Sequence, residues 1–377
     1  MAVDTPATIA IIGGGPIGLE AGLYARFLGY DVLLFERGEI ASHIEAWGHV
    51  EMFTPFSMNR SSLALAALDA QGLRELPAGG DYLTGKEWRK RYLLPLSQTD
   101  LLADSIHTKT SVIDVSRQEI LKHEMPGSED RATSQFRVVV VGPSGEASYL
   151  ADVVIDCSGV VGRPNRIGAG GALAVGEREI CESFHHLPPD LSGRDRQEFA
   201  GKTTLLVGAG YSAATTAVAL ATVAETDPET RFVWAIRDDR EAPIRRIVND
   251  RLPTRDALAK AANDLAASDL AASDLAGANR CCTIRRSSGI ESVRRDDVGR
   301  YSVRFTGEEK DQLFDNIVAN VGFRGDTSIT EQLQVHRCYA SDGPMKLAAA
   351  LMQSDSVDCL DQTSSGAASL QNPEPDF

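Results

Sequence analysis

Two glycine-rich turns constrain the fold of this 377-residue chain more than any other feature. The first, Gly-Gly-Gly-Pro-Ile-Gly at residues 13–18, follows the apolar run 7–12 and opens a helical pattern. The second, Gly-Ala-Gly-Tyr-Ser-Ala at residues 208–213, follows the apolar run 203–207. A strand, a tight glycine turn and a helix in this order form the phosphate-binding corner of a dinucleotide-binding fold. Two such corners predict two bound dinucleotides, which is typical of proteins that pass electrons between them.

Glycine is required in the first turn for geometric reasons. Gly13 lets the chain leave the strand sharply, Gly15 lets the backbone approach a pyrophosphate, and Gly18 lets the helix pack closely on the strand. The free N–H groups and the dipole at the helix N-terminus then favour the negative charge of a phosphate. Alanine is an accepted substitute for glycine at the third position. The matching residues of the second turn are Gly208, Gly210 and Ala213.

The residue that ends the next strand selects the ribose contact. In the first half of the chain, residues 19–28 predict a helix that stops at Gly29, and residues 31–35 predict a buried strand that ends at Glu36. A carboxylate at this place accepts hydrogen bonds from a ribose diol. The alternative is an ordinary capped helix followed by a surface glutamate that binds no ligand.

In the second half of the chain the corresponding strand, 231–236, is followed by Arg237. An arginine at this place suits a ribose 2′-phosphate, which predicts NADP rather than NAD. Asp238 and Asp239 follow directly, and either carboxylate would instead serve NAD. Three more arginines add positive charge nearby, namely Arg240, Arg245 and Arg246.

Composition and charge exclude several classes of protein. A net charge of −15 and a pI of about 5.0 argue against a nucleic-acid partner, because nucleic-acid-binding domains are usually basic. The six cysteines form no CxxC pair and no metal-ligand spacing, which predicts no bound metal and fits a reducing compartment. No charged-then-apolar leader precedes the first strand, and no apolar run approaches membrane-spanning length. The sequence therefore predicts a soluble, cytoplasmic protein, and it leaves the oligomeric state open.

The residues between the two turns predict further elements. The loop 38–55 leaves the carboxyl end of a strand, where ligands bind in dinucleotide folds. Its Trp47 either stacks on a bound ligand or simply anchors the loop. Helices are expected at 61–71 and at 84–105, the latter interrupted near Pro95, and strands at 110–115, 136–141 and 149–155, with a hairpin turn at 142–145.

Three segments carry no predicted chemistry. Residues 162–201, rich in Gly, Pro, Arg and Asp, are predicted to be a linker, in which His185-His186 is solvated or packed. Residues 256–278 contain a five-residue repeat, and each step of five residues rotates a helix by about 140°. The leucines of the repeat therefore spread around the axis, which predicts a surface insertion. The tail 363–377, rich in Ser, Gly and Pro, is predicted to be loosely ordered.

Together these motifs resemble the two-dinucleotide-binding flavoproteins, and within them the flavin-containing monooxygenase-like branch. The first glycine turn with Glu36 is similar to the FAD site of that family. Residues 201–213 (Gly-Lys-Thr-Thr-Leu-Leu-Val-Gly-Ala-Gly-Tyr-Ser-Ala) are similar to its NADPH site, including the serine before the last small residue. Asp-Cys-Ser-Gly at 156–159 and Asn-Val-Gly-Phe at 320–323 resemble its two Ala-Thr-Gly-type strand ends. The elements occur in the order of the family and cover nearly the whole chain.

The chain also departs from the family pattern. The Phe-Gly-His signature expected before the second turn is absent, and Phe184-His185-His186 lies near its place without matching. The cysteine pairs of thioredoxin reductase and glutathione reductase are absent, which argues against disulfide chemistry. The last strand and helix of the family have no counterpart before Phe377, so the resemblance predicts a truncated last segment.

The resemblance implies an α/β fold with two Rossmann-like dinucleotide-binding domains, in which the NAD(P) domain is inserted in the FAD domain. The cofactors it implies are FAD and NADPH. The predicted boundaries are 1–165 for the FAD-binding domain, 166–200 for a linker region, 201–330 for the NAD(P)-binding domain with a low-complexity insertion at 256–278, and 331–377 for the return to the FAD domain.

The resemblance further implies an FAD-dependent oxidoreductase reduced by NADPH, which passes hydride from the nicotinamide to the flavin and then to oxygen or a small-molecule substrate. Two alternatives stay open: a flavin-dependent reductase or dehydrogenase without oxygen insertion, and a nucleotide-binding homologue without turnover. The sequence identifies no catalytic side chain and no substrate. The candidate FAD-binding residues are Gly13, Gly15, Pro16, Gly18, Glu36, Arg37, Trp47 and Gly159, with His43 beside Trp47 as a candidate for the flavin edge. The candidate NADPH-binding residues are Gly208, Gly210, Ser212, Ala213 and Arg237.

Overall fold

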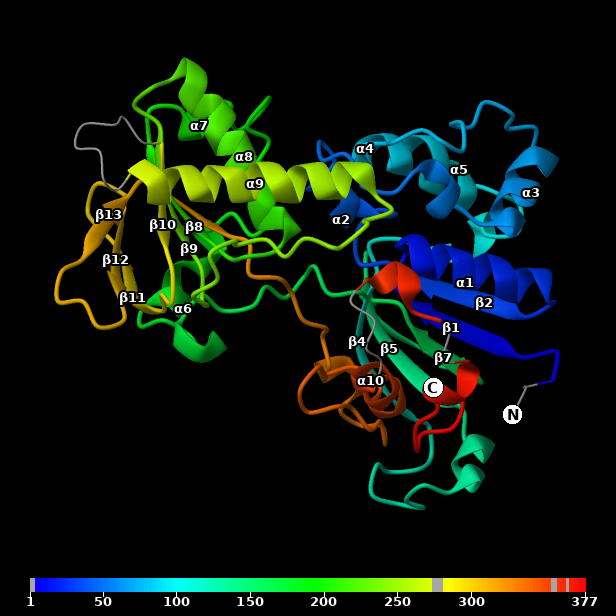
Figure 1. Ribbon diagram of the computed structural model, residues 1–377. Coiled ribbons are helices and arrows are strands. Elements are labelled where there is room, and N and C mark those ends of the chain that lie inside the picture. The colour runs from blue at the N-terminus through cyan, green and yellow to red at the C-terminus, as the bar shows by residue number, and fades with distance from the viewer. Residues whose placement is uncertain (1–3, 273–280, 354–357, 364–365) are drawn as a thin grey trace. The chain divides into compact units, whose positions relative to one another are not determined.

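The computed structural model divides into two compact α/β units (Figure 1). Unit 1 comprises residues 1–48, 54–163 and 324–377, and unit 2 comprises residues 49–53 and 164–323. Most of unit 2 is therefore inserted in the sequence of unit 1. This confirms the predicted α/β fold in which one domain is inserted in the other. The residues that the structure describes are 4–272, 281–353, 358–363 and 366–377.

Each unit is built on a four-stranded parallel sheet with the same plan. In unit 1 the strand order is β3 (Ile106–His107), β2 (Asp31–Phe35), β1 (Thr8–Ile12), β7 (Val153–Asp156). In unit 2 the strand order is β10 (Cys282–Arg285), β9 (Arg231–Ala235), β8 (Thr203–Val207), β14 (Asn316–Ala319). In both sheets the strand before the glycine turn pairs with the next parallel strand on one side and with the last one on the other. The two turns therefore start from equivalent central strands.

Each unit also contains a three-stranded antiparallel sheet. In unit 1 it consists of β4 (Ser111–Arg117), β5 (Phe136–Gly142) and β6 (Gly145–Ala151). In unit 2 it consists of β11 (Ile290–Arg295), β12 (Tyr301–Phe305) and β13 (Gln312–Phe314). The pairing of Gly142 with Gly145 confirms the predicted hairpin turn. In unit 1 the two sheets share one apolar core, formed in part by Ala10, Ile12, Phe35, Val115, Phe136, Val138 and Val154.

The expected strand 149–155 is instead two strands in different sheets. β6 ends at Ala151 and β7 begins at Val153. Between them the Asp152 carboxylate accepts hydrogen bonds from the Thr8 backbone N–H (2.8 Å) and from the Gln135 side-chain amide (2.8 Å). The single polar residue therefore separates the antiparallel sheet from the parallel one within a run that is otherwise apolar.

Several helices of unit 1 begin at local sequence signals. α1 (Pro16–Phe27) has proline at its first position, where no N–H donor is needed. α3 (Ser62–Ala70) is capped by Ser61, whose hydroxyl accepts a backbone N–H from the first turn. α4 (Gly85–Trp88) begins in a capping box formed by Thr84. The other α-helices of this unit are α2 (Ser42–Glu45), α5 (Leu94–Ser97) and α10 (Met345–Met352).

The predicted helix 84–105 is confirmed only over its first half. α4 continues into a π-helical turn, η2 (Arg89–Leu93), and then into α5, which ends at Ser97. Pro95 lies in the first turn of α5, and its missing N–H removes one hydrogen bond of the helix at this point. A local widening to π geometry accommodates such an interruption. Among the described residues the short 3₁₀ helices are η1 (Phe56–Met58), η3 (Ala103–Ser105), η4 (Glu129–Thr133), η5 (Ala169–Gly171), η6 (Cys181–Ser183), η7 (Ser328–Thr330), η8 (Cys359–Asp361) and η9 (Ala367–Ser369).

The core of unit 2 lies on both faces of its parallel sheet. On one face, α8 (Tyr211–Thr226) and α9 (Pro253–Ala272) pack over Leu206 and Trp234 (Figure 1). On the other face the antiparallel sheet packs over Leu205. The alternation of neighbouring leucines between the two faces is expected for a buried parallel strand. The described part of this unit also has two short helices, α6 (Glu177–Ile180) and α7 (Arg196–Phe199). None of the helices in the described ranges has the length and apolarity that crossing a membrane requires.

The segment 166–200, predicted to be a linker, belongs to the packed core of unit 2. Ile167, Ala174 and Phe184 are buried with side chains of β11 and β12. The Glu177 carboxylate is 1% exposed and accepts the backbone N–H groups of Ile167 (3.1 Å) and Ala174 (2.8 Å). The linker prediction is wrong. It was based on the average composition of the segment, which is that of a loop, whereas a few widely spaced apolar residues and one buried acid fix the segment in the core.

α9 contradicts the predicted surface insertion at 256–278 over its described part. Ala259, Ala262 and Ala266 are fully buried in the core that α9 shares with α8. Their spacing of three and four residues places them on one face of the helix. The packing face therefore follows the alanines rather than the leucines on which the prediction was based. Residues 273–278 lie outside the described residues.

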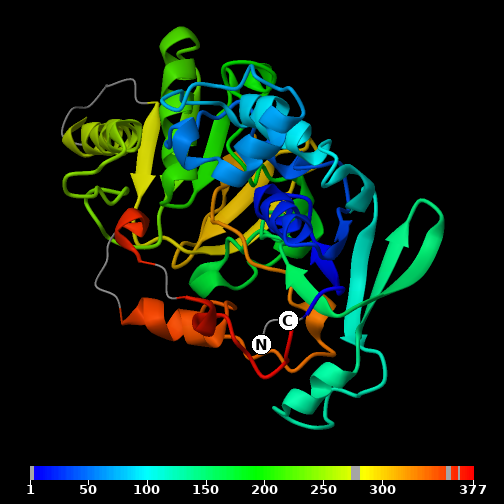
Figure 2. The ribbon, with the colours of Figure 1, turned by 90° about the vertical axis from the view of Figure 1, so that its right-hand side faces the viewer.

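The tail 363–377, predicted to be loosely ordered, is held by a buried ion cluster. Its Glu374 pairs with Arg117 through Nε to Oε1 (2.8 Å) and with Arg131 through Nη2 to Oε2 (3.0 Å). All three side chains are 0% exposed. The backbone N–H of Gln334 donates a further hydrogen bond to the Glu374 carboxylate (2.8 Å). Figure 2 shows the tail in red beside α10. Within this segment residues 364 and 365 are not described.

We expect Glu374→Gln to destabilise the protein by about 3–5 kcal/mol, because the substitution leaves two buried guanidinium groups without their carboxylate. Chemical denaturation measures the change in the free energy of unfolding. Glu75→Gln is the matched control: Glu75 is exposed and has no ion pair with a described residue, so the expected change is within about 0.5 kcal/mol.

The same cluster predicts a pH dependence of stability. Burial raises the pKa of Glu374, but the hydrogen bonds from Arg131, Gln334 and Arg117 outweigh burial and lower this pKa overall. The stabilisation is therefore complete above the pKa of an unfolded glutamate, about 4.3, and is lost as the pH falls through the lower folded value. Equal unfolding free energies for Glu374→Gln and the wild type at neutral pH would contradict this role.

Candidate functional site

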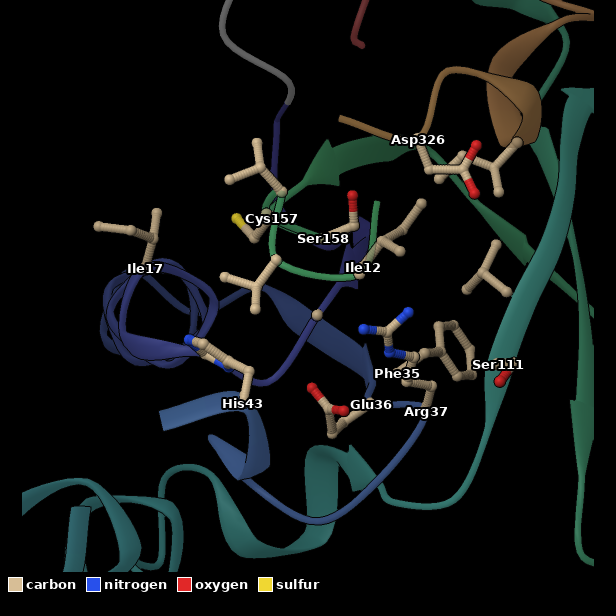
Figure 3. Close-up of a pocket in the computed structure, with 18 of the residues that line it drawn as sticks. Ile12, Ile17, Phe35, Glu36, Arg37, His43, Ser111, Cys157, Ser158 and Asp326 are labelled. Carbon is tan, nitrogen blue, oxygen red and sulfur yellow. The ribbon is translucent and has the colours of Figure 1, made fainter. Parts of the chain in front are cut away.

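A cavity of about 350 Å³ lies at the carboxyl ends of β1, β2 and β7 in unit 1 (Figure 3). Its lining residues come from the first glycine turn, the end of β2, α2, the start of β4, the segment after β7 and the return segment near residue 324. All of these belong to unit 1. In open α/β sheets, ligands bind at this edge of the strands.

The first glycine turn is closed against the neighbouring strands. The Gly13 backbone N–H donates to the Phe35 carbonyl at the end of β2 (2.8 Å). Gly13 has a φ of +106°, and a Cβ atom there would overlap the carbonyl oxygen of Cys157 beyond β7. A Cβ atom on Gly18 would overlap the carbonyl oxygen of Gly13. Glycine at both positions is therefore a steric requirement of the turn.

The N-terminus of α1 opens into the cavity. Gly15 is the N-cap and supplies no side-chain acceptor for the first-turn N–H groups. Pro16 follows at the first helical position, and both residues line the cavity. The backbone N–H groups of the first turn and the positive end of the helix dipole are therefore available to an anionic ligand.

Glu36 lies at the end of β2 and lines the same cavity (Figure 3). It is 8% exposed, and its two carboxylate oxygens accept the backbone N–H groups of Gly14 (2.7 Å) and Gly38 (2.8 Å). These bonds fix the orientation of the carboxylate and use one acceptor site on each oxygen. A carboxylate oxygen accepts more than one hydrogen bond, so both oxygens can also accept from a ribose diol.

Two further candidates, Arg37 and Gly159, also line the cavity. The Arg37 guanidinium lies against Gly162, where a Cβ atom would approach both terminal nitrogens to 2.8 Å. Gly159 has a φ of +70°, which turns the chain after β7. Figure 3 shows the Arg37 side chain reaching inward from the end of β2 beside Phe35. Arg37 therefore adds positive charge to the cavity beside the carboxylate of Glu36.

The structure separates the two candidates for the flavin edge. Trp47 does not line the cavity; its ring packs on Gly85 at the start of α4, where a Cβ atom would approach it to 2.6 Å. Of the two interpretations of Trp47, this contact agrees with the anchoring one. His43 does line the cavity, and its ring lies beside Gly15 (Figure 3).

Cys157 is the cysteine of this cavity. Burial, with a smaller contribution from the negative charge of Asp156, raises the pKa of Cys157 to about 11. The thiol is therefore neutral at physiological pH. Because the thiolate is the species that attacks a disulfide, Cys157 is poorly suited to thiol–disulfide exchange.

Three charged residues of the cavity, Arg163, Arg324 and Asp326, are not among the predicted site residues. The guanidinium of Arg163 pairs with the Asp326 carboxylate at 2.6 Å, and the Arg324 backbone N–H donates to the Arg163 carbonyl at 3.0 Å. The available signal was an arginine a few residues beyond each of the two matched strand ends. Asp326 gave no comparable signal, because it becomes a neighbour of Arg163 only through the fold.

Unit 2 repeats the glycine turn. The Gly208 backbone N–H donates to the Ala235 carbonyl at the end of β9 (3.1 Å). Gly208 has a φ of +127°, and a Cβ atom there would overlap the Asn320 carbonyl oxygen after β14. Gly210 is the N-cap of α8 and supplies no side-chain cap. The indole N–H of Trp234 donates to the Gly208 carbonyl (2.7 Å), which holds the turn on the sheet.

The remaining candidates of unit 2 surround this second turn. Ala213 is fully buried in the helix–sheet core, and Ser212 is exposed in the first turn of α8. Arg237 follows β9, is exposed, and makes no ion pair with a described residue. Asp238, by contrast, pairs with Arg240, whose hydrogen bond lowers the pKa of Asp238.

A second basic feature lies in the same region of unit 2. A cavity of about 520 Å³ is lined by Arg240, Arg245 and Arg246, together with Ile244 and Asn263. The three arginines noted in the sequence, which are near neighbours along the chain, line this cavity together with Glu241.

His185 and His186 do not form a metal site in the described part of the chain. His185 pairs with Glu198 (2.9 Å), and the Nε2–H of His186 donates a hydrogen bond to the Cys181 carbonyl (2.9 Å). Across the residues that the structure covers, no group of three or more metal-ligating side chains comes together.

Neither protein-family models nor curated proteins match this chain. Solved structures do match its fold over most of its length. A bacillithiol disulfide reductase from Bacillus cereus superposes with a TM-score of 0.62 at 16% identity, covering 90% of this chain and 85% of that one. The cadaverine monooxygenase DfoA from Erwinia amylovora gives a TM-score of 0.61 at 16% identity, covering 91% and 86%. The ornithine N-hydroxylase from Kutzneria sp. 744 gives a TM-score of 0.56 at 15% identity, covering 89% and 86%.

These likenesses define the fold class. The chain has the fold of the two-dinucleotide-binding-domain flavoproteins, which includes both reductases and monooxygenases. At this level of identity the likeness concerns the fold, and the chemistry has to be argued from the residues of the chain.

The steric role of Gly13 predicts a specific stability difference. Gly29 also has a positive φ, +91°, but a Cβ atom there meets nothing within 4 Å. Gly29→Ala should therefore cost about 1–2 kcal/mol, the strain of a left-handed backbone alone. Gly13→Ala should cost roughly 1–3 kcal/mol more, because the same strain is joined by overlap with the Cys157 carbonyl. Denaturant unfolding of both variants measures the difference, and equal destabilisation would refute the close approach of Gly13 to Cys157.

Proposed function

We propose that this protein is an FAD-dependent oxidoreductase reduced by NADPH, with FAD held in unit 1 and NADPH held in unit 2. The observation that supports this proposal is the repetition of one phosphate corner. In each unit the first glycine donates to the end of the next parallel strand and lies against the carbonyl that follows the last parallel strand. In each unit the turn then opens a helix whose N-cap supplies no side-chain acceptor.

The residues of unit 1 fit the pyrophosphate of an FAD molecule and the ribose next to it. The first-turn N–H groups of α1 would bind the pyrophosphate, and Glu36 would accept hydrogen bonds from the ribose diol. Gly159 and Arg37 border the same cavity and would contact the rest of the cofactor. Pro16 and Gly18 act on the backbone, the first by starting the helix and the second by allowing the close turn.

The residues of unit 2 fit NADPH. Gly208, Gly210 and the exposed Ser212 would bind the pyrophosphate, and Ala213 allows α8 to pack on the sheet. Arg237 would bind the 2′-phosphate, which makes NADP the preferred cofactor. The engagement of Asp238 with Arg240 supports this choice, because it occupies one of the two acids that would otherwise bind the ribose diol of NAD.

FAD bound in unit 1 would supply the redox chemistry, by accepting a hydride from the nicotinamide and passing electrons on to oxygen or to a small-molecule substrate. The protein would bind and orient the cofactors and exclude water. This division of roles explains why no nucleophile with its base is needed in the cavity.

We favour a monooxygenase-like reaction over a reductase or dehydrogenase without oxygen insertion. The neutral thiol of Cys157 supports this preference, since it weakens the case for disulfide reduction. Among the similar structures, DfoA is a cadaverine monooxygenase bound to FAD, and the Kutzneria enzyme is an ornithine N-hydroxylase solved with reduced FAD, NADP⁺ and L-ornithine. A small-molecule substrate in a cytoplasmic setting is part of the same proposal.

The first test is the visible spectrum of the protein, with Gly210→Ala as the informative variant. A Cβ atom on Gly210 meets nothing within 4 Å, so the variant should fold normally while its methyl group obstructs the approach of the pyrophosphate. We expect a flavin spectrum that bleaches on anaerobic addition of NADPH. Gly210→Ala should keep the flavin but bind NADPH at least about tenfold more weakly, a loss of about 1.4 kcal/mol. Gly80→Ala, which also enters open space, is the control.

Each result of this test has a distinct meaning. A protein that stays colourless when FAD is supplied contradicts the FAD site, and a flavin that NADPH does not reduce contradicts the electron path. If reduction occurs, oxygen consumption coupled to an oxygenated product supports the monooxygenase. Reduction of another acceptor without oxygen insertion supports the alternative reductase or dehydrogenase. Binding of both dinucleotides without any electron transfer corresponds to a homologue without turnover.

The choice of NADPH over NADH is tested at Arg237. We expect Arg237→Ala to raise the KM for NADPH roughly tenfold or more and to change the KM for NADH little, because only NADPH carries the 2′-phosphate. Steady-state reduction of the flavin with each nucleotide measures both constants. Arg178→Ala, at an exposed arginine elsewhere in unit 2, is the control. Equal effects on the two nucleotides rule out the 2′-phosphate role.

A further inference from the structure

His43 lies beside the N-terminus of α1 inside the cavity of unit 1 (Figure 3). Its ring atom Cε1 is 3.2 Å from the position that a Cβ atom of Gly15, the N-cap residue, would occupy. A phosphate bound by the first-turn N–H groups of α1 would therefore meet the imidazole of His43. We propose that His43 is a direct ligand of the pyrophosphate of the dinucleotide bound in unit 1, a role that rests on the proposed FAD site.

The backbone holds His43 in this place. The Ala41 N–H donates to the Gly14 carbonyl (3.0 Å), which attaches the start of α2 to the glycine turn. The Arg89 guanidinium donates to the Ile40 carbonyl (2.9 Å) and pairs with Glu45 of α2 (3.0 Å). The helix that carries His43 is thus fixed at both ends. The backbone that carries the imidazole is thus positioned before a ligand arrives, so binding a ligand costs little ordering of this segment.

The ring of His43 is free to bind a ligand. Neither ring nitrogen hydrogen-bonds to a residue that the structure describes, although the side chain is partly buried. His185, in contrast, is engaged by Glu198. His43 lines the cavity, and its partly buried imidazole has an unmet capacity to hydrogen-bond that a phosphate oxygen would satisfy.

The charges around His43 favour a role that depends on protonation. Burial lowers the pKa of His43, Glu36 at the end of β2 raises it, and Arg37 lowers it. Glu45 on α2 is paired with Arg89, and the first turn of α1 carries no acidic side chain. The ring is therefore largely neutral without a ligand. The two negative charges of a pyrophosphate would raise this pKa, so binding takes up a proton.

The direction of the pH dependence follows from this linkage. A group whose pKa is higher in the complex than in the free protein strengthens binding at low pH. The affinity for FAD should therefore be greatest below the pKa of His43 in the free protein and should fall as the pH rises through the pKa in the complex. Each unit of difference between the two pKa values corresponds to a tenfold change in affinity.

The test measures dissociation constants by calorimetry, with FAD and ADP-ribose as probes, on protein from which any flavin has been removed and whose site in unit 2 is saturated with NADP⁺. ADP-ribose carries the pyrophosphate without the flavin ring. His43→Ala should weaken both probes by about tenfold or more, and by the same factor, as expected for the loss of a hydrogen bond to a charged group. His43→Gln keeps a donor but does not titrate, so it should bind both probes with a flatter pH dependence than the wild type. His123→Gln, at an exposed histidine elsewhere in unit 1, should match the wild type.

Other results overturn the inference. Unchanged ADP-ribose affinity in His43→Ala would remove the phosphate contact, and a loss confined to FAD would place His43 at the flavin edge instead. A pH dependence equal in His43→Gln and the wild type would refute the role of protonation. Thermal melting of each variant without ligand identifies a folding defect. Wild-type protein that binds neither probe would overturn the proposed FAD site itself, whereas wild-type binding with unchanged variants overturns only the role of His43.

Discussion

The contact between a glycine and the carbonyl beyond the last parallel strand is the constraint on which each unit depends. Gly13 lies against Cys157 in unit 1, and Gly208 lies against Asn320 in unit 2. Each glycine also donates its N–H to the end of the second strand. Three strands are therefore tied together at one point where no side chain fits. The direction of the following helix, and with it the place of the cavity in unit 1, is determined by this close packing.

The sequence predicts this part of the fold well because the information is local. A turn of six residues, the strand before it and the acid or arginine after the next strand lie within a short stretch of chain. Glu36 illustrates this: its position at the end of a strand follows from the pattern, and the structure adds that two backbone N–H groups orient its carboxylate. The sequence does not indicate that Trp47 packs on Gly85, because that contact depends on the path of a long loop.

Several of the predictions that were wrong concern contacts between distant residues. The ion pair of Glu374 with Arg117 joins residues 257 positions apart, and nothing in the polar, proline-rich tail announces it. For α9, the prediction was based on the leucines of the five-residue repeat, whereas the alanines form the face that packs in the core. Charge behaves similarly. The chain has a net charge of −15, yet the fold brings Arg37, Arg163 and Arg324 to the cavity of unit 1. Net charge therefore says little about the field at a particular site.

The short segment 49–53 determines how this protein can be divided. It lies between two parts of unit 1 in sequence but belongs to unit 2, where the Phe53 ring meets Tyr211 edge-on at 5.5 Å and its carbonyl accepts a hydrogen bond from Thr254 (3.4 Å). A protein fragment of residues 164–323 alone would lack residues 49–53. In that fragment the Tyr211 ring would lose its contact with Phe53. A protein designed to contain unit 2 alone should therefore include residues 49–53, for example joined to residue 164 through a linker.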